Sequence, residues 1–107
     1  MNFIPSPDLL KDLKRLGKKY PSIADDLDIV KSNLVEDPFQ GESLGRSCYK
    51  IRMVITSKGR GKSGGARVIT CVKIVNDTIY LLTIFDKSEK ENISDEELTE
   101  LLKFVEA

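Results

Sequence analysis

The residues best suited to chemistry lie in one short stretch in which cations alternate with glycines. Positions 58 to 67 read KGRGKSGGAR, with four basic residues and four glycines. Glycine lets the backbone approach a ligand closely, and lysine and arginine supply charges and donors that match phosphate. The stretch leads directly into a β-branched run from Val68 to Val75. It therefore predicts a strand-anchored loop that holds a polyanion, the alternative being a solvated hairpin loop whose charges only maintain solubility.

The tripeptide Gly61-Lys62-Ser63 matches the end of a nucleotide-binding P-loop, but two required features are missing. That motif needs a glycine five places earlier, where this chain has Thr56. It also needs a helix directly after the Lys-Ser pair, so that the helix N-terminus faces the phosphates. Here the next regular segment, 66–72, has the pattern of a strand. These differences exclude a P-loop.

The formal net charge of zero conceals a basic middle segment. Residues 46–90 contain ten Lys or Arg and three acids, a net charge of +7, whereas residues 1–45 carry −2 and residues 91–107 carry −5. Electrostatic attraction depends on the local field rather than on the total charge. The middle segment therefore suits a polyanionic partner.

Length and composition restrict the class of protein. A chain of 107 residues is expected to form one domain, 1–107, around a single core. The chain has no apolar run of membrane-spanning length and no leader-like N-terminus, which predicts a cytoplasmic protein with no membrane contact. Without histidine or a CxxC pair, no metal site and no cofactor are expected. Cys48 and Cys71 lie in apolar, strand-like segments and are expected to be buried and reduced.

Helices are predicted on both sides of the basic segment. Ser6 followed by Pro7 is a typical helix start, and leucines then recur on one face until Tyr20-Pro21. A second helix is predicted from Ser22 to Asp37-Pro38, and residues 39–46 are expected to form a loop. A last helix begins at Ser94, which forms a capping box with residue 97.

Three strands are predicted between these helices, at 48–55, 66–75 and 78–85, the last two joined by a two-residue hairpin turn at 76–77. Residues 2–5 are a candidate edge strand. The predicted fold class is α+β: an antiparallel sheet of three to four strands, an N-terminal helical hairpin and a C-terminal helix.

This order of elements, together with two motifs, resembles the RelE/ParE toxin superfamily and, within it, the HigB-like branch of type II toxin–antitoxin systems. The first motif is GKSGGARVI, residues 61–69, and the second is LLTIFDKSEKE, residues 81–91. The resemblance covers essentially the whole chain, and the two motifs together are more specific than either alone.

The resemblance implies a small cytosolic toxin that enters the ribosomal A site and cuts mRNA without a metal ion. It also implies a cognate antitoxin protein that wraps and neutralises the toxin. The expected activity is that of a metal-independent endoribonuclease, and the expected partners are the antitoxin, the ribosome and mRNA. The superfamily also contains gyrase poisons that cut no RNA.

Two sets of site residues follow from the resemblance. In the catalytic set Arg67 is the phosphate clamp and Glu89 is either a proton acceptor or a salt-bridge partner of the neighbouring lysines. That set is Arg67, Lys87, Lys62 and Glu89. The substrate-binding set is Lys58, Arg60, Lys90 and Arg52. Lys50 shares a strand face with Arg52, and both either flank the cleft or face solvent.

The chain departs from the family pattern in its acid–base residues. Several family ribonucleases use a histidine or tyrosine near the last strand and helix, whereas this chain has no histidine and has Asn92-Ile93-Ser94 in that region. Tyr49 and Tyr80 are expected in the core, so the general base and acid remain unassigned. Three hypotheses follow: a ribosome-dependent endoribonuclease, a gyrase-directed poison, and a non-catalytic relative that only binds an antitoxin.

Overall fold

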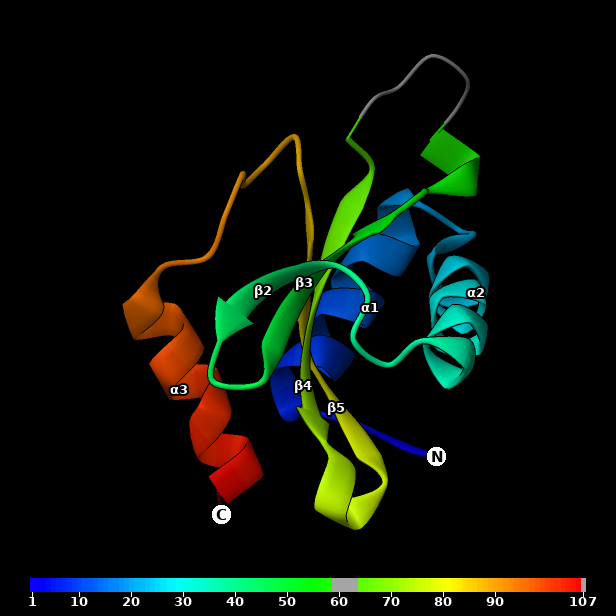
Figure 1. Cartoon of the computed structure of the whole chain (residues 1–107). Helices are drawn as coiled ribbons and strands as arrows, with labels where there is room; N and C mark the ends of the chain where they lie inside the picture. Colours follow the sequence, from blue (N-terminus) through cyan, green and yellow to red (C-terminus); the bar gives the residue numbers. More distant parts are fainter. Residues whose placement is uncertain (59–63, 107) are drawn as a thin grey trace.

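A five-stranded sheet separates two layers of helices (Figure 1). The computed structural model describes residues 1–58 and 64–106. Its strands are β1 (Asn2–Pro5), β2 (Glu42–Gly45), β3 (Cys48–Met53), β4 (Ala66–Lys73) and β5 (Thr78–Asp86), arranged in the order β1-β5-β4-β3-β2. The helices are α1 (Pro7–Lys19), α2 (Ile23–Glu36) and α3 (Asp95–Glu106). Short 3-10 turns occupy Thr56–Lys58 and Ile74–Asn76.

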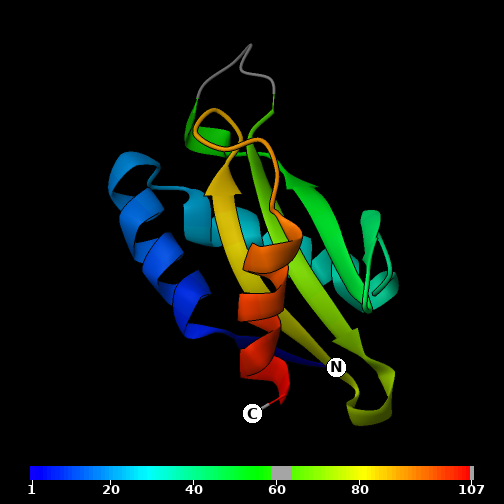
Figure 2. The same cartoon turned by 90° about the vertical axis from the view of Figure 1, so that its left-hand side faces the viewer.

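The helices cover opposite faces of the sheet (Figures 1 and 2). Leucines of α1 and α2, including Leu16 and Leu34, form the larger core with one face of β3, β4 and β5. Leu98 and its neighbours on α3 form a smaller core with the other face. β4 and β5 are therefore buried on both sides, which explains why both strands are apolar almost throughout. No helix within the described residues is long and apolar enough to cross a membrane.

The predicted helix starts at Ser6 and Ser94 are confirmed. The Ser6 side chain accepts a hydrogen bond from the Leu9 amide at 3.0 Å and donates one to the Leu82 carbonyl at 2.6 Å, so it also fixes α1 to β5. At α3 the Glu97 amide donates to the Ser94 hydroxyl at 3.1 Å, and the Ser94 amide donates back to the Glu97 carboxylate at 3.2 Å. Both starts were predictable because a cap depends only on residues within one helical turn.

The sheet differs from the prediction at both edges. Residues 39–46, expected to be a loop, contain β2, which pairs antiparallel with β3. β1 pairs with β5 in parallel, so the sheet is mixed and has five strands rather than three to four antiparallel ones. β2 escaped prediction because three of its four residues are exposed and only Leu44 is apolar and partly buried. An edge strand of this kind is defined by its partner rather than by its own pattern.

The strand ends also differ from the predicted ones. β3 ends at Met53 rather than at 55, and β4 ends at Lys73 because residues 74–76 form a 3-10 turn. Asp77 then adopts a left-handed conformation with φ 50°, so the connection to β5 is longer than a two-residue hairpin. The α+β class is nevertheless as predicted, and Cys48 and Cys71 are both buried and unbridged, as expected.

Candidate functional site

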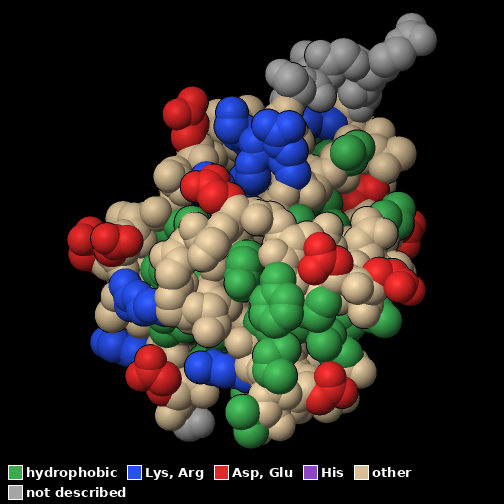
Figure 3. Space-filling view, in the orientation of Figure 1, with side chains coloured by type: hydrophobic (Ala, Val, Ile, Leu, Met, Phe, Trp, Pro, Cys, Tyr) green, Lys and Arg blue, Asp and Glu red, His purple; other side chains and the backbone are tan. Residues whose placement is uncertain are grey.

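A basic hollow of about 350 Å³ lies at the end of the sheet where β4 begins and β5 ends. Figure 3 shows basic side chains gathered at this end of the molecule, the upper end in that view. The lining of the hollow combines four cations with two acids and a glycine: Lys50, Arg52, Arg67, Lys87, Glu42, Glu91 and Gly41. The excess of positive charge in a concave site suits a phosphate group.

Arg67 is the most buried cation of the hollow. Only 6% of the residue is exposed, and it lies opposite Arg52 in the β3–β4 register. Its guanidinium donates hydrogen bonds to the carbonyls of Gly64 and Ala66 and forms no ion pair among the described residues. Burial, together with the charge of Arg52, lowers the pKa of Arg67. A buried charge without a counter-ion is unfavourable, so an incoming anion would relieve an existing electrostatic penalty.

Two glycines shape the wall of the hollow beside Lys87. Gly64 has φ +94°, and a Cβ there would lie 3.3 Å from Cδ of Lys87, so the lysine stem packs directly over the glycine. Gly65 has φ +49°, and a Cβ there would lie 2.3 Å from the Met53 carbonyl oxygen. The Gly65 carbonyl also accepts a hydrogen bond from the Lys87 amide at 3.0 Å. Both φ values favour glycine, and at Gly65 an added side chain would also clash with the backbone.

A buried acid beside the hollow was not identified in the sequence. Asp86, at the end of β5, has no exposed surface. Its carboxylate accepts hydrogen bonds from the Tyr20 hydroxyl at 2.6 Å, from Nζ of Lys58 at 2.9 Å, and from the amide and hydroxyl of Ser88. Burial alone would raise the pKa of Asp86, but these hydrogen bonds more than offset burial and hold its pKa well below the ordinary value. The network ties the end of α1, the turn before residue 59 and the end of β5 together.

The structure separates the predicted site residues into groups. Arg52, Arg67 and Lys87 share the hollow with Lys50. Lys58 instead pairs with Asp86, which raises the pKa of Lys58. Arg60 and Lys62 lie outside the described residues.

Glu89 and Lys90 point away from the hollow. Glu89 pairs with Arg15 of α1 at 3.5 Å rather than with either neighbouring lysine. Lys90 pairs with Glu97 of α3 and lies 5.4 Å from the centre of the Phe85 ring. The backbone explains both placements, because the amides of residues 89 and 90 donate to the Asp86 carbonyl in a tight turn. The acids that do line the hollow, Glu42 and Glu91, gave no signal in the sequence.

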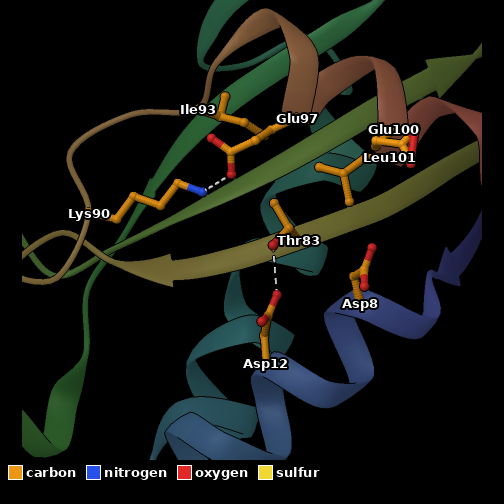
Figure 4. Close-up of a pocket in the computed structure, with 8 residues that line it drawn as sticks. All are labelled: Asp8, Asp12, Thr83, Lys90, Ile93, Glu97, Glu100 and Leu101. Atoms are coloured by element: carbon orange, nitrogen blue, oxygen red, sulfur yellow. Dashed lines mark hydrogen bonds and ion pairs between the residues drawn. The ribbon is translucent and has the colours of Figure 1, made fainter.

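A second hollow, of about 330 Å³, lies between α1 and α3 (Figure 4). Four of its eight lining residues are acidic: Asp8, Asp12, Glu97 and Glu100. Asp12 accepts hydrogen bonds from the Thr83 hydroxyl at 2.6 Å and from the Ile84 amide at 3.2 Å, and so covers the part of the β5 edge beyond β1. Lys90 is already bound to Glu97 here. This hollow is consequently unsuited to phosphate.

Two comparisons with known proteins bear on the family and the fold of the chain. A model of the family described as the RelE toxin of the RelE/RelB toxin–antitoxin system matches residues 11–107. The fold is similar to that of a mutant of the E. coli toxin RelE in the free state, with a TM-score of 0.64 and 18% sequence identity. That match covers 95% of this chain and 94% of the E. coli chain.

Proposed function

Because the chain belongs to the RelE toxin family, we propose that it is a toxin that cuts messenger RNA on the ribosome, as a metal-independent endoribonuclease. The observation that carries this proposal is the position of Arg67. This cation is buried, has no ion pair among the described residues, and shares a hollow with Arg52 and Lys87. A phosphodiester entering the hollow would meet three cations from three different segments.

The chemistry is attack of a ribose 2′-oxygen on the adjacent phosphorus with departure of the 5′-oxygen. The 2′-hydroxyl loses a proton, negative charge develops on a pentacoordinate phosphate, and the leaving oxygen gains a proton. Arg67 would bind the equatorial oxygens through its planar fork, and Lys87 would add a second charge. Fixed charges of this kind supply the largest part of many rate enhancements.

A carboxylate of the hollow would accept the proton of the 2′-hydroxyl. Glu42 already pairs with Lys50 at 3.4 Å, whereas Glu91 lines the hollow and forms no ion pair among the described residues. We assign Glu91 as the proton acceptor in this proposal. Glu89, held against Arg15, is then a structural residue.

The proposal includes a cognate antitoxin and a cytoplasmic location. A basic hollow that must be inactive in resting cells calls for an acidic or amphipathic partner segment, which commonly folds on binding. The Arg52, Arg67 and Lys87 side chains would be the first groups that such a segment neutralises.

Induction of the chain alone in a bacterial host tests the proposal, with primer extension on abundant messages. We expect growth arrest with discrete cuts that depend on translation. Arg67→Ala should abolish both, whereas Arg46→Ala should leave both unchanged, because Arg46 is an exposed arginine that bonds Thr99 outside the hollow. Growth arrest in which the messages stay uncut but the DNA is broken would instead support a gyrase poison. Absence of arrest would support a non-catalytic antitoxin-binding relative.

A further inference from the structure

The exposed face of α1 carries a basic stripe that the hollow does not use. Lys11, Lys14, Arg15 and Lys18 are spaced by three, four and seven residues, and all four are exposed. Such spacing places them on one side of the helix, opposite Leu9 and Leu16, which are buried against the sheet. From Lys11 to Lys18 the stripe extends about 10 Å along the helix axis.

The charges of the stripe are mostly uncompensated. Arg15 pairs with Glu89, but no ion pair joins the three lysines to an acid within the described residues. Of the acids on α1, Asp12 is held by Thr83 and Asp8 lies in the first turn. The favourable position of cations at a helix C-terminus accounts for Lys18, but it does not account for Lys11 or Lys14, which lie earlier in the helix.

The stripe and the hollow lie on either side of one short segment. Tyr20, directly after α1, bonds Asp86, and Arg15 bonds Glu89. Lys87, between those two acids, lines the hollow. Figure 2 shows the C-terminal end of α1 beside the end of β5. The Arg15–Glu89 ion pair therefore connects the stripe to the segment that carries Lys87.

We propose that this face of α1 is a second binding surface, for the phosphate backbone of RNA that extends beyond the hollow. The inference rests on the proposed function for the identity of the polyanion as RNA. The composition of the stripe favours a nucleic acid over an acidic protein segment. Protein interfaces depend on apolar or aromatic anchors at their centre, and the stripe consists of lysine and arginine alone. Phosphate contacts require only charge and reach.

Binding of RNA to the full chain as a function of salt tests the proposal. The probes are a 2′-O-methyl single strand, which has no free 2′-hydroxyl to react, and a duplex of the same length. The variant Lys11→Gln/Lys14→Gln/Lys18→Gln preserves helix propensity. Its matched control, Lys31→Gln/Lys73→Gln/Lys103→Gln, changes the net charge equally at positions on other elements. Circular dichroism confirms that both variants are folded.

We expect the α1 variant to bind at least one probe about tenfold more weakly at low salt. Its slope of log affinity against log salt should be shallower by about two to three, because each lost phosphate contact removes about 0.7 to 0.9 from the slope. In the control variant, the affinity at low salt and the salt slope should each change by less than half as much as in the α1 variant. Single strand and duplex show which form of RNA the stripe prefers.

Three outcomes overturn the proposal. Equal losses in both variants would indicate a general charge effect, and no loss in the α1 variant would show that RNA does not reach the stripe. A polyglutamate peptide that binds the unmodified chain as tightly as RNA, with the same dependence on α1, would indicate an acidic protein partner instead. Failure of the chain to cut mRNA, with the binding difference intact, would reject the proposed function alone.

Discussion

At the scale of single residues, Arg67 holds a positive charge where only 6% of the residue reaches solvent. Its partners are two backbone carbonyls, and its register neighbour on β3 is another arginine. Replacing a poorly compensated buried charge by an apolar side chain of similar volume is often neutral or stabilising. Substitution of Arg67 can therefore separate an effect on stability from an effect on the proposed mRNA cleavage.

We expect Arg67→Met to keep or raise the melting temperature while lowering mRNA cleavage by at least about a hundredfold. The first effect follows from removal of the unpaired charge, and the second from loss of an electrostatic contact to the phosphate. Thermal denaturation and cleavage in a purified translation system measure the two effects. Destabilisation by several kcal/mol would show that Arg67 serves mainly as a structural residue.

Glu91 and Glu89 form a matched pair for testing the proton acceptor, because they lie two residues apart in the segment between β5 and α3. Glu91 lines the hollow, and Glu89 pairs with Arg15. General base catalysis contributes about 10² to 10⁴ in rate. We expect Glu91→Gln to lower the cleavage rate within that range and Glu89→Gln to change it less than about threefold. A larger loss of cleavage rate in Glu89→Gln than in Glu91→Gln would instead indicate Glu89 as the proton acceptor.

We expect the buried carboxylate of Asp86 to make the protein less stable at acid pH. Its pKa is held below the ordinary value in the folded chain, so its contribution is fully present above the unfolded pKa of about 3.9. The contribution decreases as the pH falls from that value towards the lower pKa of the folded state. Asp86→Asn also leaves half-buried Lys58 without its counter-charge. We expect Asp86→Asn to lower the free energy of unfolding by about 3 to 5 kcal/mol at neutral pH. The difference between the variant and the unmodified protein should become smaller below about pH 4.

Urea denaturation between pH 7 and pH 3 measures this difference, with exposed Asp25→Asn on α2 as the control. A loss that is independent of pH would mean that the Asp86 carboxylate is not the stabilising species.

At the scale of elements, the backbone at Gly65, directly before β4, holds the segment that follows β5. Gly65→Ala would force a side chain into positive φ and within 2.3 Å of the Met53 carbonyl. Gly45→Ala also places a side chain at positive φ, +81°, but meets no atom within 4 Å. We expect Gly65→Ala to destabilise by clearly more than the roughly 1 kcal/mol expected of Gly45→Ala.

Gly65→Ala should also lower mRNA cleavage, because the Gly65 carbonyl holds the Lys87 amide. Denaturant unfolding and the cleavage assay measure both effects. Equal destabilisation by the two variants would show that the Met53 carbonyl adjusts to the added methyl group.

Elements defined by local signals were predictable, and those defined by partners were not. The capping residues Ser6 and Ser94 predicted where α1 and α3 begin, and apolar runs in the sequence indicated β4 and β5. The parallel pairing of β1 and the existence of β2 depend on contacts with strands distant in sequence. Arg67 and Lys87 were assigned to one site from the resemblance, and both line the hollow because β4 begins where β5 ends. The directions of Glu89 and Lys90 depend on the turn that the Asp86 carbonyl closes, for which the sequence has no distinct pattern.

At the scale of the whole molecule, the sheet divides the apolar interior into two unequal cores. The larger core joins α1 and α2 to the sheet, whereas the smaller one depends on few residues of α3, among them Leu98. Regions with few buried apolar contacts open at lower free energy than the rest of a protein. We therefore expect α3 to detach from the sheet before the molecule unfolds. Cys48 and Cys71, which have no exposed surface and lie in the smaller core, would report that opening.

Alkylation of the two thiols under native conditions tests this order of events. Leu98→Ala and Leu16→Ala remove the same side chain from the α3 core and from the α1 core, where each residue is almost fully buried. A buried Leu→Ala substitution costs about 2 to 5 kcal/mol, so Leu98→Ala should accelerate alkylation by at least about 30-fold. Leu16→Ala should have a much smaller effect, because α1 stays in place when α3 opens. Equal acceleration by the two variants would mean that the thiols react only through global unfolding, and that the two cores form one cooperative unit.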